Sequence, residues 1–273
     1  MHWLIERNVA NEDSYDNFVA TVDRLGIPYS IITVVPFSHE IIDFPEDSEG
    51  PYFVYGSVTL CNKIAPKMGW KVFTNENFDY EVWSEKWKGD LLNEEAVTGP
   101  FQSVPINHER FFIRPCKDNK AFTGLVTTIQ DYHDWVDKVR IVKHSDYGSS
   151  EDVNFDLDEM VMVSPVQNIA QEIRFYIVRN RVVTHSTYRL GNRTTYLDES
   201  YTNQDAIWFV QGIIHTWQPD DAFVLDVALV DGEYKVIEVN CINCAGMYAS
   251  DVNKLVDAFN TQLLYGGLGY GRI

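Results

Sequence analysis

Residues 222–243, AFVLDVALVDGEYKVIEVNCIN, contain the pattern that decides the fold. Two apolar runs flank Asp231-Gly232, a dipeptide that favours the tight turn of a β-hairpin. Three polar residues interrupt these runs: Asp226, Glu238 and Asn240. Because side chains alternate along a strand, Glu238 and Asn240 project from the same face of the second strand.

The length of the hairpin loop decides whether Asp226 joins them. A two-residue loop, Asp231-Gly232, would turn Asp226 away from the face of Glu238. A three-residue loop that starts at Val230 pairs Asp226 with Val236 and places Asp226 on that face. The same register collects apolar side chains on the opposite face: Phe223, Leu225, Val227, Leu229, Ile237 and Val239. We therefore predict the three-residue loop, because strand register follows the hydrophobic pattern.

Two carboxylates and a carboxamide on one face of a sheet repel one another unless a positive charge lies between them. Their oxygens are hard ligands, which suit Mg²⁺ better than Zn²⁺. The alternative is an edge hairpin with one solvated face, on which these residues need no function. The hairpin alone does not distinguish these two interpretations.

Composition sets the class of protein. A chain of 273 residues can bury a large core and divide into two lobes. Its hydrophobic content of 45%, with 14% aromatic residues, excludes a mainly disordered protein. The 22 Lys and Arg residues are outnumbered by 40 Asp and Glu residues, and the net charge of −18 repels nucleic-acid phosphates unless a local basic cleft overrides it. Nucleic acid is therefore not an expected partner.

We expect a cytoplasmic protein, in the host cytoplasm if the source is viral. No run of 18 apolar residues is present, so no membrane partner is expected. The start of the chain, MHWLIERNVANED, has neither a basic leader nor an apolar signal core. Cysteines in this compartment are expected to be free thiols. Cys241-Ile-Asn-Cys244 lacks the second pair of a zinc ribbon, so two packed thiols are favoured over a redox or zinc site.

Strands and helices alternate over the first hundred residues. The predicted strands are 3–5, 29–34 and 52–55, and the predicted helices are 13–25 and 58–68. This alternation predicts a parallel α/β domain over residues 1–100. We place its boundary at Thr98-Gly99-Pro100, because this tripeptide breaks regular structure.

Residues 101–265 predict an α+β domain. Besides the hairpin, the predicted strands are 111–115, 160–163, 172–178 and 182–189, and the predicted helices are 128–139, one capped by Thr202, and one that starts at Ser250-Asp251. Cations at strand ends could hold phosphates, and the hairpin anions could hold Mg²⁺; a nucleoside triphosphate site needs both. The Gly-rich tail, 266–273, opens no helix and is predicted to be a flexible terminus rather than a phosphate loop.

Over about residues 110–260 the chain resembles the ATP-grasp superfamily. Residues 236–240, VIEVN, are similar to the last metal-binding strand of that family, and Asp226 resembles its other metal carboxylate. Arg114 stands where most members carry a Lys over the ATP phosphates, which resembles a clade frequent in bacteriophages and bacterial operons. Residues 118–124 are similar to the phosphate-covering loop of that clade. The resemblance implies an ATP-grasp-like fold, in which two antiparallel-sheet subdomains hold the nucleotide.

The resemblance also implies a role for each candidate residue. The implied phosphate-binding residues are Arg114 and Lys120. The implied hinge, whose backbone contacts adenine, consists of Val161, Met162 and Val163, and Glu172 is the implied ribose ligand. The implied metal ligands are Asp226, Glu238 and Asn240, and the implied catalytic cations are Arg189 and Arg174.

The implied activity is ATP- and Mg²⁺-dependent ligation of a carboxylate to an amine. A carboxylate on a small molecule, peptide or protein would attack the γ-phosphate, and an amine would capture the resulting acyl phosphate. Two alternatives are an ATP-binding regulatory protein without ligase activity and an acidic decoy that imitates nucleic acid. No general base is identified: His185 and His215 are candidates by residue type alone, and each is expected to be structural.

Overall fold

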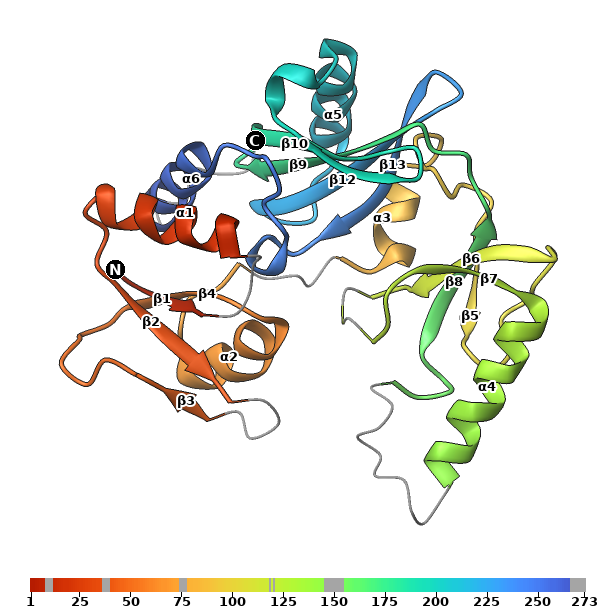
Figure 1. Cartoon of the computed structure of the whole chain (residues 1–273), viewed down its shortest axis with the longest axis horizontal. Helices are drawn as coiled ribbons and strands as arrows, with labels where there is room; N and C mark the ends of the chain where they lie inside the picture. Colours follow the sequence, from red (N-terminus) through yellow and green to blue (C-terminus); the bar gives the residue numbers. More distant parts are fainter. Residues whose placement is uncertain are drawn as a thin grey trace.

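Three β-sheets with helices packed on them follow one another across the molecule (Figure 1). The computed structural model describes residues 1–7, 12–35, 40–73, 78–117, 119, 121–144 and 155–265. Lys120 and the tail 266–273 lie outside these residues. The N-terminal sheet and the small sheet occupy opposite ends, with the central sheet between them (Figure 1). None of the described helices could cross a membrane.

The N-terminal sheet has the spatial order β3 (Ile41–Ile42), β2 (Tyr29–Val34), β1 (His2–Glu6) and β4 (Tyr52–Tyr55). β1 is parallel to β2 and β4, and β3 adds an antiparallel edge. Alternate β1 side chains face opposite cores: Trp3 packs with α1 (Glu12–Arg24), and Leu4 packs with η1 (Thr59–Ile64) and α2 (Ala65–Met68). The predicted α/β lobe is confirmed.

The central sheet is antiparallel throughout, in the order β11 (Arg193–Leu197), β10 (Arg181–Leu190), β9 (Gln171–Val178), β12 (Ala222–Val230) and β13 (Glu233–Asn240). On one face, Phe175 and Phe223 pack against α5 (Gln204–Thr216). On the other face, Tyr176 and Val224 share a core with α1 and α6 (Val252–Tyr265). That core covers only half of the second face, and the other half carries polar side chains.

The small sheet is also antiparallel, in the order β5 (Val97–Pro100), β8 (Met160–Pro165), β6 (Arg110–Pro115) and β7 (Leu125–Thr128). Phe111 and Val161 bury one face against Tyr132 and Val136 of α4 (Ile129–His144). The pair of antiparallel sheets that the ATP-grasp resemblance implies is therefore confirmed.

Two local predictions are wrong. Thr98-Gly99-Pro100 does not break the chain but forms β5, because its backbone pairs with β8. The cap of α5 is Asn203, whose side chain accepts from the Asp205 backbone N–H, and not Thr202. α3 (Tyr80–Lys86) and the turn after it pack through Trp83 and Trp87 onto the core of the central sheet. The domain boundary near residue 100 stays a prediction.

The predicted three-residue hairpin loop is wrong as well. Val230 pairs with Glu233, so the loop is Asp231-Gly232, with φ of 50° and 85°. These positive φ values are typical of a two-residue hairpin turn. A β-bulge then inserts one extra residue, Ile237, between the pairs that β12 forms with Val236 and Glu238. A bulge reverses the alternation beyond it, so Glu238 directly opposes Asp226.

The bulge therefore produces the shared polar face that was attributed to the loop. It also exchanges two apolar residues. Val236 joins the core against α5, whereas Ile237, predicted on that apolar face, lines the polar side.

Candidate functional site

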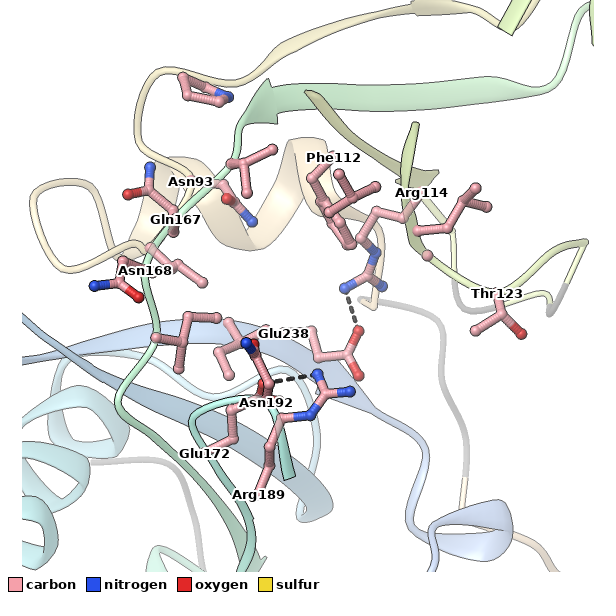
Figure 2. A pocket seen from close by; sticks show the side chains of 18 of the residues that line it. Asn93, Phe112, Arg114, Thr123, Gln167, Asn168, Glu172, Arg189, Asn192 and Glu238 are labelled. Carbon is pink, nitrogen blue, oxygen red and sulfur yellow. Dashed lines mark hydrogen bonds and ion pairs between the residues drawn. The ribbon is translucent and has the colours of Figure 1, made fainter. Parts of the chain in front are cut away.

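A cavity of about 700 Å³ lies between the polar half-face of the central sheet and the small sheet. β6 supplies Phe112 and Arg114 to its wall, and β9, β10 and β13 supply Glu172, Arg189 and Glu238. The linker 165–169, between β8 and β9, closes a third side. Figure 2 shows the labelled side chains from these elements directed at one space.

Two ion pairs mark one end of the cavity. Arg114 Nη1 on the small sheet is paired with Glu238 Oε2 on the central sheet, and these side chains are 9% and 26% exposed. Arg189 Nη1 donates to Glu172 Oε1 at 3.1 Å (Figure 2). The structure thus gathers four charged residues that the sequence singles out on four separate strands.

A second cluster lies behind Glu238. Asn240 Nδ2 donates to Glu238 Oε1 at 2.7 Å and to Asp226 Oδ2 at 3.3 Å. Arg174 grips the Asp226 carboxylate with both ends of its fork, Nε to Oδ1 at 2.8 Å and Nη2 to Oδ2 at 2.7 Å. Burial raises the pKa of Asp226 to about 6, and the Arg174 guanidinium opposes that rise. The three predicted metal ligands therefore adjoin one another, but only Glu238 lines the cavity.

Aromatic rings and a carbonyl enclose Arg174. Its guanidinium carbon lies 4.9 Å from the centre of the Tyr248 ring and 5.6 Å from that of Tyr188. Its Nη1 donates to the Gly246 carbonyl at 3.3 Å. Arg174 is 8% exposed and does not line the cavity. The catalytic role predicted for it does not match this position, because a ligand in the cavity would meet Arg114 and Arg189 instead.

The predicted adenine hinge is misplaced. Val161, Met162 and Val163 lie inside β8, which pairs with β5 on one side and β6 on the other. Both neighbouring strands use the backbone groups of β8, and these three buried side chains do not line the cavity. The linker 165–169 lines it instead. Sequence reasoning identified the strand and its terminal proline but placed the hinge a few residues too early.

The remaining candidates lie away from the cavity. His185 is buried against the Phe175 ring, and burial lowers its pKa. His215 is exposed near the end of α5, so neither histidine is a candidate base by position. Cys61, Cys116 and Cys241 are buried free thiols, in line with the packed-thiol prediction. The side chain of Cys244 is outside the described part of the structure.

Asn93 and the polar linker residues Gln167 and Asn168 also line the cavity, and the sequence did not single them out. Asn93 lies in the turn before β5, where no periodic pattern marks a face. Arg110 and Lys117 add two further cations from either end of β6. Charge alone could have suggested these two, because basic residues are scarce in this acidic chain.

The oxygen donors near Glu238 fit Mg²⁺ held jointly with a phosphate. Among the described residues, no group of three or more His, Cys, Asp or Glu side chains is arranged to hold a metal. Mg²⁺ rarely needs such a cage, because it commonly takes one or two carboxylates, water and the phosphates of its substrate. Glu238 and Asp226, bridged by the Asn240 amide, match that smaller set.

Comparisons with known proteins agree with this architecture. The model of an ATP-grasp domain family, the second family of its clade, matches residues 95–258, more than half of the chain. No curated protein matches the sequence.

Solved structures of ligases are similar in fold. A D-alanine–D-alanine ligase from Bacillus anthracis complexed with ATP is 14% identical with a TM-score of 0.58, over 97% of this chain and 98% of that one. Another structure of that ligase is 11% identical with a TM-score of 0.56, over 95% and 92%. The ATP-grasp ligase PsnB complexed with a minimal precursor is 9% identical with a TM-score of 0.53, over 96% and 98%. At these identities the likeness concerns the fold, and the family model makes the chain a member of that family of ATP-grasp domains.

Proposed function

We propose that the protein is an ATP- and Mg²⁺-dependent carboxylate–amine ligase. The observation that carries this proposal is the pair of ion pairs, Arg114–Glu238 and Arg189–Glu172, at one end of a cavity whose other end is largely apolar. A nucleoside triphosphate needs apolar surface for its base and cations for its phosphates within one site. This cavity offers both.

ATP would lie with its base at the linker and its phosphates at the ion pairs. The apolar side chains available to the base are Leu92, Phe112, Val126, Pro165, Val166, Ile169 and Ile237. Glu172 would accept from the ribose hydroxyls. The planar fork of Arg114 can hold two phosphate oxygens at once, which a Lys in its place cannot do. Lys120, on the chain that leads from β6 to β7, remains part of the proposed phosphate contacts.

Glu238, Asn240 and Asp226 are the residues that would hold Mg²⁺. The bound ion would offset phosphate charge and polarise the transferred phosphoryl group. Arg174 is proposed as a positioning residue, because its fork fixes the Asp226 carboxylate from behind. The arginines Arg114 and Arg189 would turn from their carboxylates to the phosphates as the nucleotide binds.

The proposed reaction has two steps. An oxygen of the substrate carboxylate attacks the γ-phosphorus, the bond to the bridging β–γ oxygen breaks, and ADP leaves with that electron pair. The amine nitrogen of the second substrate then attacks the acyl carbon, phosphate leaves, and the amine gives up a proton. Arg114 and Arg189 would supply fixed positive charge where phosphate charge moves, so catalysis is positioning and electrostatics. Small-molecule and peptide carboxylates are both proposed substrate classes.

Gathered cations favour this proposal over an acidic decoy. A decoy that imitates nucleic acid has no use for Arg110, Arg114, Lys117 and Arg189 around one cavity. A regulatory ATP-binding protein would use the same residues, and only turnover separates it from a ligase.

The binding test is thermal unfolding with ATP in the presence of Mg²⁺ or EDTA, on the wild type and on Glu238→Gln. Ligand at a hundred times its Kd stabilises the fold by about 2.7 kcal/mol, or roughly 5–10 °C for a chain of this size. We expect Mg²⁺ to enlarge the shift in the wild type. In Glu238→Gln we expect no gain from Mg²⁺, and ATP with EDTA should bind at least as well because a repelling carboxylate is gone.

Glu233→Gln is the matched control, since this carboxylate lies on the same strand but is 74% exposed and outside the cavity. It should respond to Mg²⁺ like the wild type. A wild type without an ATP-dependent shift, or a Glu238→Gln variant that keeps its Mg²⁺ dependence, would contradict the binding site.

The turnover test measures phosphate released from ATP with pools of carboxylates and amines. A ligase should release phosphate only when both pools are present, and Glu238→Gln should lose at least about a hundredfold in rate. Full ATP consumption by Glu238→Gln would remove the assignment, and binding without turnover would favour the regulatory protein.

A further inference from the structure

The turn between α3 and β5 reaches the cavity from outside the residues that the family model matches. Two backbone hydrogen bonds attach this turn to β13 beside the Ile237 bulge, Leu92 N–H to the Val236 carbonyl at 2.8 Å and Val236 N–H to the Asp90 carbonyl at 2.8 Å. The next residue, Asn93, lies two positions before the matched range 95–258. The central sheet therefore holds Asn93 in place at the cavity wall.

The side chain of Asn93 is fixed from the small sheet as well. Its Oδ1 accepts from the Ser164 hydroxyl at 2.9 Å, and its backbone carbonyl accepts from the Tyr80 hydroxyl at 2.9 Å. Asn93 is 5% exposed and Ser164 is 1% exposed. Ser164 stands at the end of β8, where the linker 165–169 begins. Asn93 thus bridges both sheets at the hinge between them.

This arrangement leaves the amide nitrogen of Asn93 for a ligand. Because Ser164 occupies Oδ1, the donor Nδ2 is the group that remains, and within the described part of the chain it has no protein acceptor. A buried N–H without an acceptor costs free energy unless water or a ligand satisfies it. Figure 2 shows the Asn93 amide between Gln167 and Phe112, away from Arg189 and Glu172.

We propose that Asn93 reads the nucleotide base, and that its Nδ2 donates a hydrogen bond to a ring nitrogen of the purine. This inference rests on the proposed ATP site. Phosphates belong at the ion pairs, whereas Asn93 borders the apolar side chains Leu92, Phe112 and Pro165, which suit a flat base. A rigid donor discriminates against a base without an acceptor at that point, because the donor then stays unpaired.

The test measures the Kd of ATP and of its 1-deaza, 3-deaza and 7-deaza analogues by calorimetric titration. Each analogue replaces one ring nitrogen by a C–H group. We expect the wild type to bind one of the three about 3- to 10-fold more weakly than ATP because of this contact. Asn93→Leu should bind ATP more weakly by a similar factor and should lose that discrimination. Asn93→Asp keeps the shape and the acceptor but not the donor, and should behave like Asn93→Leu.

Asn168→Ala is the matched control, since it removes a second amide from the same wall and should keep the discrimination. Equal affinity of the wild type for ATP and all three analogues would overturn the inference without any variant. Discrimination that persists in the Asn93 variants, or that disappears in Asn168→Ala, would overturn it too. A wild type that binds no ATP would overturn the proposed function itself, which separates the two failures.

Discussion

Replacement of Arg174 by Met is expected to be the most destabilising single change at the site. Arg174 and Asp226 are 8% and 1% exposed, so Arg174→Met leaves a buried carboxylate without its partner. Loss of one member of a buried ion pair costs about 3–5 kcal/mol. The cation–π contact at 4.9 Å from Tyr248 adds roughly 0.5–2 kcal/mol. We therefore expect a loss of about 4 kcal/mol or more, because Met preserves most of the packed volume.

The second variant, Asp226→Asn, makes the reasoning refutable. It is expected to cost about 3 kcal/mol alone, since it leaves the Arg174 charge buried. The double variant Arg174→Met/Asp226→Asn buries no uncompensated charge, so its loss should be smaller than that of Arg174→Met alone. Urea titration of the four proteins without nucleotide measures all three differences. If the losses of the two single variants simply add in the double variant, Arg174 does not stabilise the Asp226 carboxylate and the positioning role is wrong.

The same variants predict a pH dependence. Burial raises the pKa of Asp226 to about 6 although Arg174 opposes the rise, so this pKa is higher still in Arg174→Met. A raised folded-state pKa means that the folded chain holds the proton more tightly than the unfolded chain, so stability is gained as the pH falls and lost as it rises. The deficit of Arg174→Met should therefore shrink between about pH 8 and pH 6. A deficit that grows over this window would contradict the assignment.

Three further changes test other parts of the structure. A Cβ added to Gly124 would lie 2.7 Å from Phe112 Cζ, so Gly124→Ala should cost about 1–3 kcal/mol and weaken ATP binding in a calorimetric titration. Gly232 has a φ of +85°, and Gly232→Ala should lose about 1 kcal/mol in urea unfolding; no loss would argue against the two-residue loop. Burial lowers the pKa of His185, so protonation favours the unfolded chain, and His185→Phe should lose less melting temperature than the wild type between about pH 7 and pH 5.5.

The ion pairs in the cavity have a consequence for affinity. Arg114 and Arg189 are held near the proposed phosphate position by Glu238 and Glu172 before any ligand arrives. Rigid side chains lose less entropy on binding, which favours affinity. The carboxylates repel Mg²⁺-free phosphate at the same time, so the arrangement selects for the metal complex of the nucleotide.

The hairpin shows where sequence reasoning succeeded for an incomplete reason. Residue chemistry and alternation correctly placed Asp226, Glu238 and Asn240 on one face. The loop length was wrong, because a bulge at Ile237 produces the same pairing of faces as a longer loop. Both solutions satisfy the local pattern, and only the contact of β13 with the turn at residues 90–92 distinguishes them.

The sequence by itself determined the order of most strands and helices, the polar strand ends and the resemblance to ATP-grasp proteins. These features depend on local alternation, on turn residues and on side-chain chemistry, which a linear pattern records.

Only the tertiary structure decided which partners meet. Asn93 and Ser164 are 71 positions apart, and Arg114 and Glu238 are 124 apart, so no local periodicity links them. The hinge moved from residues 161–163 to the linker 165–169 because neighbouring strands claimed the backbone of β8. Contacts between distant segments compete for the same groups, and the outcome of that competition is a property of the packed chain.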